Sequence, residues 1–94
     1  MVDLTVKFLS TFKEVAGTDE MKLPVSEGFR VEGLLDLLES KGVRVKHHIQ
    51  SGGSVYSTSL LIFVNGFEIS VLNGLATELK NGDIVTFIPV VHGG

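Results

Sequence analysis

The chain has 94 residues and a formal net charge of −3, and it contains no cysteine. This length suits one domain with one core, and we expect residues 1–94 to form it because no Pro- or Ser-rich linker divides them. The acidic balance argues against direct binding of nucleic acid, which needs a basic surface to neutralise phosphates. The lack of cysteine excludes a thiolate nucleophile, a Cys-based metal site and a disulfide framework.

The first residues do not have the pattern of a targeting segment. Asp3 and Lys7 interrupt the N-terminal apolar residues, and no long apolar run follows them. The sequence therefore predicts neither a signal peptide nor a membrane span, and we expect a cytoplasmic protein that does not interact with a membrane.

Two segments near the N-terminus have the period-two pattern of strands. Residues 2–9 alternate between the two faces, and Met21, Leu23 and Val25 alternate again. Residues 10–19 between them are polar and contain a turn glycine. We interpret the two runs as a hairpin with a long connection.

The next apolar residues recur at helical spacing, at Val31, Leu34, Leu35 and Leu38. Lys41 and Gly42 supply the cationic last turn and the glycine that end such a helix. Its start is poorly marked, because Arg30 occupies the N-cap position and Gly33 costs about 1 kcal/mol relative to alanine. The pattern predicts one main helix that covers one face of a sheet.

Residues 43–59 show no clear periodicity, and we expect a surface excursion there. His47 and His48 are adjacent, so on a strand they would point to opposite faces. No cysteine or third ligand lies near them in sequence, and no metal site is expected.

Residues 60–64 are almost wholly apolar and end at Asn65-Gly66, a strong signal for a tight hairpin turn. Residues 67–71 should return as a short edge strand, and residues 75–79 have room for no more than one helical turn.

Residues 83–89 form the last predicted strand. Val85 and Phe87 point to one face, while Ile84, Thr86 and Ile88 point to the other. Because both faces are largely apolar, the pattern indicates a central strand.

This order of elements predicts an α+β fold, with a mixed sheet of about five strands and one main helix packed on one face. If the helix makes the crossover, the last strand lies parallel beside the first. That arrangement is the β-grasp architecture of ubiquitin-like domains.

Three segments resemble the MoaD/ThiS family of ubiquitin-like sulfur carriers: residues 12–18, residues 64–66, and residues 82–89 running into Gly93-Gly94. The resemblance spans the whole chain and is strongest in its last third. A proline a few residues before the two glycines is typical of the MoaD branch, the small subunit of molybdopterin synthase.

Two features depart from the family pattern. Residues 43–59 are longer than the shortest members need, and His92 replaces the small residue often found before the glycines. A His-Gly-Gly ending also resembles ubiquitin-like modifiers that both carry sulfur and conjugate to lysines.

The resemblance implies a reaction at the Gly94 carboxylate. An E1-like adenylating enzyme of the MoaB/MoeB/ThiF type would consume ATP to adenylate it, and a persulfide would convert it to a thiocarboxylate. The sulfur would pass to an acceptor enzyme such as the molybdopterin synthase large subunit. Gly93 would give clearance in the partner's channel, with Val90, Val91 and His92 as an extended arm. The chain is expected to bind no cofactor and to be no catalyst alone.

Three alternatives stay open at this point. The chain could form isopeptide bonds with lysines as a protein modifier, or donate sulfur to transfer RNA. It could also be a β-grasp binding module whose tail is never activated.

Strand parity predicts where partners bind. If the buried residues of the first and last strands face the helix, Leu9 and Ile88 emerge on the open face and meet near the tail. Phe63 and Leu61 join them if the strand at residues 60–64 follows the same parity. We expect this apolar patch to bind the partners. The alternative is that residues 43–59 fold over it.

Overall fold

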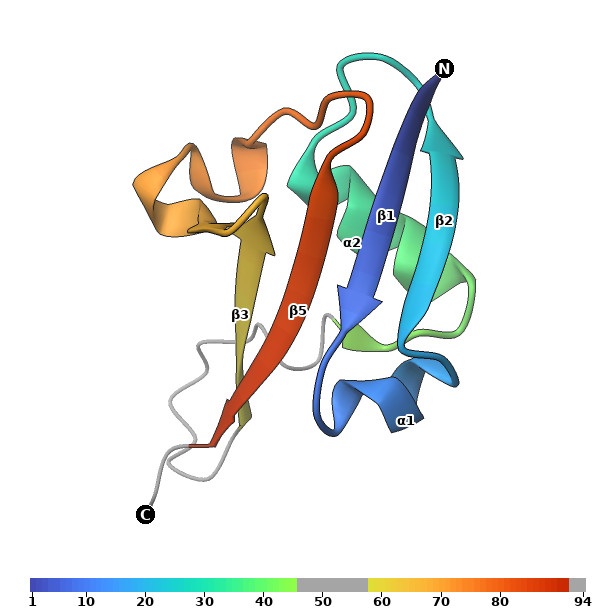
Figure 1. Ribbon diagram of the computed structural model, residues 1–94, viewed down its shortest axis with the longest axis vertical. Coiled ribbons are helices and arrows are strands. Elements are labelled where there is room, and N and C mark those ends of the chain that lie inside the picture. The colour runs from blue at the N-terminus through green and yellow to red at the C-terminus, as the bar shows by residue number, and fades with distance from the viewer. Residues whose placement is uncertain (46–57, 92–94) are drawn as a thin grey trace.

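A five-stranded mixed sheet, in the order β2-β1-β5-β3-β4, forms one layer of the computed structural model, which describes residues 1–45 and 58–91. The elements are β1 (Val2–Phe8), α1 (Phe12–Ala16), β2 (Glu20–Val25), α2 (Val31–Ser40), β3 (Thr58–Val64), β4 (Phe67–Glu68), the 3-10 turns η2 (Ile69–Val71) and η3 (Gly74–Ala76), and β5 (Ile84–Val91). Helix α2 lies across one face of the sheet, behind it in Figure 1. The predicted α+β, β-grasp architecture is confirmed.

Strand β5 is the central strand, as predicted. It pairs in parallel with β1, with Phe8 opposite Phe87, and antiparallel with β3, with Leu61 opposite Ile88. From Pro89 onward, β5 pairs only with β3. The last part of β5 therefore extends past the end of β1 (Figure 1).

The core lies between α2 and the inner face of the sheet. Alternate residues of the strands point toward the helix, and its apolar stripe points back at them. The fully buried side chains with the largest volumes are Phe8, Phe12, Phe87, Leu4, Leu34, Leu38, Leu79, Val6, Val31, Val45 and Val85. Close packing of these side chains fixes which residues of each strand face inward.

The start of α2 is held by a neighbouring segment. Arg30 is extended and makes no side-chain cap hydrogen bond. Instead, the Val31 N–H donates to the carbonyl of Thr77 at 3.0 Å, which satisfies one of the free donors of the first turn. A Cβ on Gly33 would lie 3.2 Å from the ring of Phe29. Gly33 thus makes room for Phe29, which accounts for a glycine inside the helix.

The predicted connection at residues 10–19 is not a simple polar loop. Phe12 begins the short helix α1 and is buried, and Gly17 ends it with a φ of 77°. The predicted hairpin of the two strands with a long connection is confirmed. The helix within the connection was not predicted, because its polar composition does not reveal that burial of one phenylalanine folds it onto the core.

Two further expectations need correction. The predicted edge strand at residues 67–71 stops after Glu68, because the Glu68 side chain accepts hydrogen bonds from Ser70 and the backbone turns into η2. Val43 and Val45 are buried in the core and do not belong to a surface excursion. Of the described residues, none belongs to a helix long and apolar enough to cross a bilayer.

Candidate functional site on the open face of the sheet

The predicted reacting residues Gly93 and Gly94, with His92, lie outside the described part of the chain, as do His47 and His48. The structure describes the strand that leads to them. The backbones of Val90 and Val91 pair with those of Ser59 and Thr58 on β3. Strand β3 thus supports β5 up to its last described residue.

The predicted apolar patch begins where β1 ends. The Leu9 N–H donates to the carbonyl of Phe87 at 3.1 Å, which continues the β1 and β5 pairing beyond Phe8. The next residue of β5 is Ile88, which is paired with Leu61 on β3. Leu9, directly after β1, and Ile88 on β5 therefore lie on the face opposite α2, as strand parity predicts.

We use the name open-face patch for five of the described apolar residues on this face: Leu9, Leu61, Phe63, Ile84 and Ile88. Leu9 is 40% exposed and Ile84 is 39% exposed, while the other three are half-buried. Sequence reasoning did not assign Ile84 to the patch, although its parity on β5 is that of Ile88. The alternative would place residues 43–59 over the patch, and residues 46–57 of this segment lie outside the described residues.

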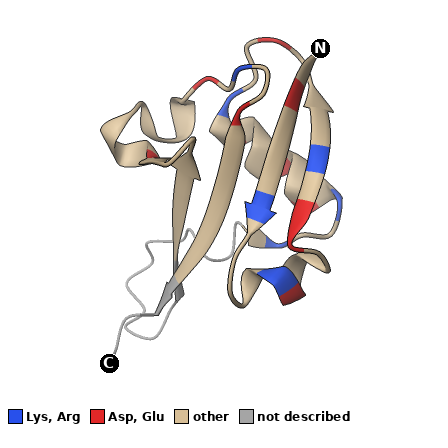
Figure 2. Ribbon diagram, viewed as in Figure 1, with Lys and Arg blue, Asp and Glu red and all other residues tan. Residues whose placement is uncertain are grey.

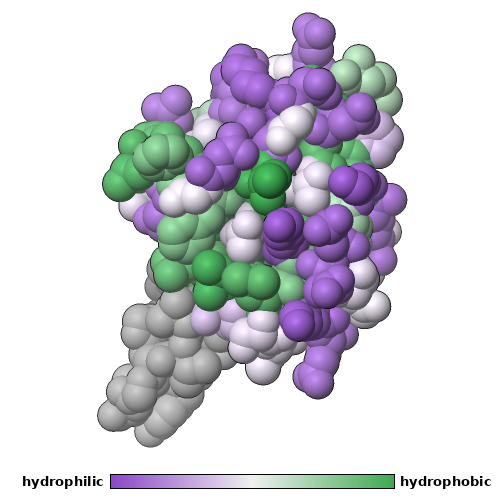
Figure 3. Space-filling model, in the orientation of Figure 1, coloured by the Kyte–Doolittle hydropathy of each residue, from purple (hydrophilic) through white to green (hydrophobic). Residues whose placement is uncertain are grey.

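Charge divides the open face into two halves. The half made by β1 and β2 carries both signs, from Asp3, Lys7, Glu20 and Lys22 (Figure 2). The outward positions of β5 and β3 carry no charge, and the acidic residue Glu68 of β4 lies opposite Phe63 at the edge of the patch. Figure 3 shows apolar side chains gathered over this second half. An uncharged apolar surface beside a mixed charged strip has the composition of a protein interface, with an apolar centre and a polar rim.

Side-chain hydrogen bonds join the turn after β3 to the start of β5 at the other end of the sheet. Asn65 donates from Nδ2 to Asp83 Oδ1 at 2.8 Å and accepts from the Ile84 N–H at 2.9 Å. Asp83 Oδ2 accepts from the Lys80 N–H at 2.7 Å. The turn after β3 is thereby tied to the start of β5. The sequence predicted the Asn65 turn but not these side-chain bonds.

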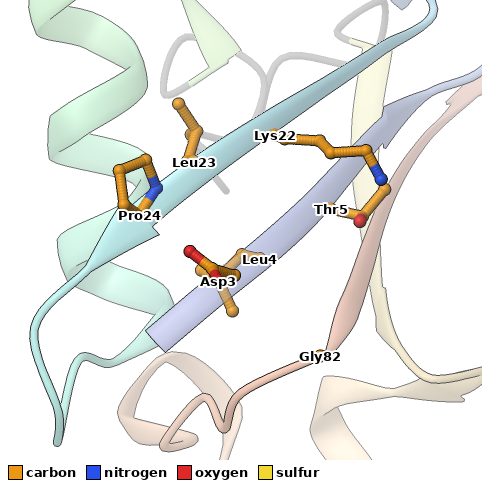
Figure 4. A pocket seen from close by; sticks show the side chains of 7 residues that line it. All are labelled: Asp3, Leu4, Thr5, Lys22, Leu23, Pro24 and Gly82. Atoms are coloured by element: carbon orange, nitrogen blue, oxygen red, sulfur yellow. The ribbon is translucent and has the colours of Figure 1, made fainter. Parts of the chain in front are cut away.

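A shallow hollow of about 400 Å³ lies at the same end, lined by Asp3, Leu4, Thr5, Lys22, Leu23, Pro24 and Gly82 (Figure 4). It lies over the first residues of β1, whereas the tail continues from the far end of β5. The described residues include no group of three His, Asp or Glu side chains that could hold a metal ion. We therefore place the candidate site at the open-face patch and not in this hollow.

Two exposed groups with shifted pKa values, Glu78 and Lys80, also lie away from the patch. Lys80 Nζ donates to Glu78 Oε2 at 2.7 Å on the surface. This hydrogen bond lowers the pKa of Glu78 and raises the pKa of Lys80. Both groups are exposed, so this pair stabilises the fold little.

Comparison with known proteins agrees with the fold. The profile of the ThiS family matches residues 6–94. Small archaeal modifier protein 3 of Haloferax volcanii is 31% identical over 99% of this chain and 100% of its own length. The structure of small archaeal modifier protein 1 from Methanosarcina acetivorans is 32% identical, with a TM-score of 0.77 over 100% of this chain and 98% of that one.

A further solved structure, from Pyrococcus furiosus and provisionally assigned as molybdopterin converting factor subunit 1, is 28% identical, with a TM-score of 0.74. The match covers 97% of this chain and 100% of that one. Because the family profile and the full-length relatives agree, the chain belongs to the ThiS family of ubiquitin-like sulfur carriers and modifiers.

Proposed function

We propose that this chain is a sulfur carrier whose Gly94 carboxylate is adenylated by an E1-like enzyme and converted to a thiocarboxylate. One observation carries the proposal. The family match continues to residue 94, and the strand that leads there has an uncharged apolar patch beside it. A carrier of this kind needs a reactive end and a surface by which partners hold it, and β5 runs through the open-face patch toward that end.

The chemistry uses only the terminal carboxylate of the chain. A carboxylate oxygen attacks the α-phosphorus of ATP, and pyrophosphate leaves. The terminal sulfur of a partner's persulfide then attacks the acyl carbon, and AMP leaves. A thiol of the partner cleaves the resulting acyl disulfide, which frees the thiocarboxylate and leaves a disulfide on the partner. The chain has no cysteine, so every thiol that takes part in these reaction steps belongs to the partner.

The two terminal glycines suit an end that reacts inside another protein. Without Cβ atoms, Gly93 and Gly94 can pass through a channel too narrow for side chains. In this scheme Val90, Val91 and His92 form the arm between the sheet and the reacting carboxylate.

The open-face patch is the proposed docking surface for the activating and acceptor enzymes. Its apolar residues lie beside the β5 strand and on the face that α2 leaves uncovered. Burial of exposed apolar side chains favours association by about 25 cal/mol per Å². Of the proposed contacts, Phe63 is the candidate hot spot because aromatic anchors dominate many interfaces.

For the acceptor, we propose a molybdopterin precursor. A proline before the terminal glycines supports it, as does the similarity to the Pyrococcus furiosus protein. Conjugation to protein lysines is the second candidate, favoured by the full-length relative named as a small archaeal modifier. Both routes start from the same acyl adenylate and differ in the nucleophile that follows.

Exchange of labelled pyrophosphate into ATP tests the first step. With the cognate E1-like enzyme, the full chain should support exchange. A chain that lacks Gly94, or one with a tag fused after it, should not. If the tagged protein supports exchange as well as the free chain, the terminal carboxylate is not the reacting group. A β-grasp binding module without an activated tail would then be the better description.

A further inference from the structure

Three Asn-Gly pairs occur in this chain, at Asn65, Asn73 and Asn81. In such a pair the backbone nitrogen of glycine can attack the side-chain amide of asparagine, since glycine has no Cβ to obstruct the approach. All three asparagines are exposed, so access to water does not distinguish them. Their hydrogen bonds do.

Asn65 and Asn81 are held by bonds that the reaction would have to break. Both polar atoms of the Asn65 amide are bonded, to Asp83 and to the Ile84 N–H. The Asn81 Oδ1 accepts from the Asp3 N–H at 2.8 Å. The attacking nitrogen of that pair, on Gly82, itself donates to the Asp3 carbonyl at 2.8 Å.

The third pair differs. Asn73 makes its hydrogen bonds through its backbone, with its N–H donating to Thr77 Oγ1 and its carbonyl accepting from Ala76. Within residues 1–45 and 58–91, neither the Asn73 amide nor the Gly74 N–H has a hydrogen-bond partner. Asn73 lies between η2 and η3, and Gly74 is the first residue of η3, in the orange segment at the upper left of Figure 1.

We propose that Asn73 is the chain's site of spontaneous deamidation. The Gly74 nitrogen loses its proton to solvent base and bonds to Cγ of Asn73. The bond from Cγ to Nδ2 breaks, and ammonia leaves with a proton from solvent. Water then opens the five-membered imide at either carbonyl and yields aspartate or isoaspartate. No enzyme, oxidant or metal enters this balance.

The product changes a surface that the proposed function does not use. Residues 69–77 carry no charge, and Val71, Leu72 and Leu75 are exposed there. Figure 3 shows this region as an apolar projection. A carboxylate at position 73 would be the first charge within residues 69–77, and it would make the formal net charge of −3 more negative by one unit.

Isoaspartate would also lengthen the main chain by one methylene. The Asn73 N–H bond to Thr77 Oγ1, at 3.1 Å, would then be displaced. Thr77 is buried, and its carbonyl accepts from the first N–H of α2. Modification of Asn73 is thereby connected to the start of the main helix.

Cleavage after glutamate separates the three sites for measurement. Glu39, Glu68 and Glu78 divide this part of the chain into peptides 40–68, 69–78 and 79–94, each with one asparagine. Folded protein is aged in mildly alkaline buffer, digested at mildly acidic pH, and each peptide is scored for exchange of an amide nitrogen for oxygen. A parallel sample is aged in urea.

In the folded sample, peptide 69–78 should react first. The other two peptides should react about tenfold more slowly, because this ratio corresponds to the net free energy of one or two hydrogen bonds that must break. In urea, the three rates should converge. The Asn73→Gln variant should lose the early mass gain, since glutamine must close a six-membered ring. Methylation of the aged protein by an isoaspartyl methyltransferase should rise in parallel. Equal rates in the folded protein, or faster reaction at Asn65 or Asn81, would overturn the proposal.

Discussion

The rings of Phe8 and Phe87 stack across the parallel pair of β1 and β5, with their centroids 5.7 Å apart and their planes 11° from parallel. Both side chains are fully buried under α2. Because successive side chains of a strand alternate between faces, the next residues, Leu9 and Ile88, emerge on the open face. The same pairing thus fills the core on one side and builds the proposed docking surface on the other.

Replacement of Phe87 by alanine should destabilise the fold severely. Loss of a buried phenylalanine costs about 3–5 kcal/mol, because the cavity it leaves collapses only in part. Urea unfolding of Phe87→Ala measures this change, with Leu9→Ala as a control for an exposed residue, expected within about 1 kcal/mol of wild type. Similar losses in both variants would contradict the assignment of the two faces.

Charged substitutions in the open-face patch should separate binding from folding. Ile88→Asp and Phe63→Asp should stay folded and lose affinity for the activating enzyme by roughly 30-fold, the effect of a hot-spot loss near 2 kcal/mol. The Phe63 variant should be the weaker binder. Calorimetric titration measures the affinity, and circular dichroism checks the fold.

Pro24→Asp is the matched control for those variants, since Pro24 is exposed on β2 and its outward position lies opposite Asp3. It adds the same charge to the open face outside the patch and should bind normally. If either patch variant unfolds, that side chain belongs to the core. If both bind like wild type, the partners use another surface.

Asn65→Gly tests whether the side-chain bonds of Asn65 hold the sheet together. Glycine keeps the positive φ of 51° available but removes the bonds to Asp83 and Ile84. We expect a loss of about 1–2 kcal/mol in the free energy of unfolding. Asn73→Gly is the matched control, because no side-chain bond of Asn73 is lost among the described residues. Equal losses would mean that the Asn65 bonds add nothing to stability.

Gly93→Val should fail in activation while its melting temperature stays at the wild-type value. A β-branched side chain restricts the extended backbone and would enter the proposed channel of the activating enzyme. Pyrophosphate exchange and thermal unfolding measure the two properties. A normal exchange rate would reject the channel, and a large drop in melting temperature would show that the tail is part of the fold.

Much of the architecture could be predicted from local sequence patterns, chiefly the spacing of apolar residues. The alternation in residues 2–9, the helical spacing from Val31 and the Asn65 turn are local signals, and each marks an element of the structure. Burial of Phe12 and of Val45 was not predictable in this way. Both depend on contacts with residues far along the chain, which no local period records.

The candidate site was also predictable only in part. Leu9, Phe63 and Ile88 followed from parity once the neighbouring strands were known, because a strand has only two faces. The bonds that tie Asn65 to Asp83 depend on the register between β3 and β5. That register is set by packing across the whole sheet, so the sequence showed a turn at Asn65 but not its partners.

Intact mass spectrometry of the chain after incubation with an E1-like enzyme, ATP and a sulfur donor tests whether the Gly94 carboxylate becomes a thiocarboxylate. We expect a species heavier than the unmodified chain by the replacement of one carboxylate oxygen with sulfur. Because the chain has no cysteine, that species alone should react with a thiol alkylating reagent. The chain that lacks Gly94 should show neither change. If only unmodified protein is found with an activating enzyme that is demonstrably active on another carrier, this chain is not a sulfur carrier.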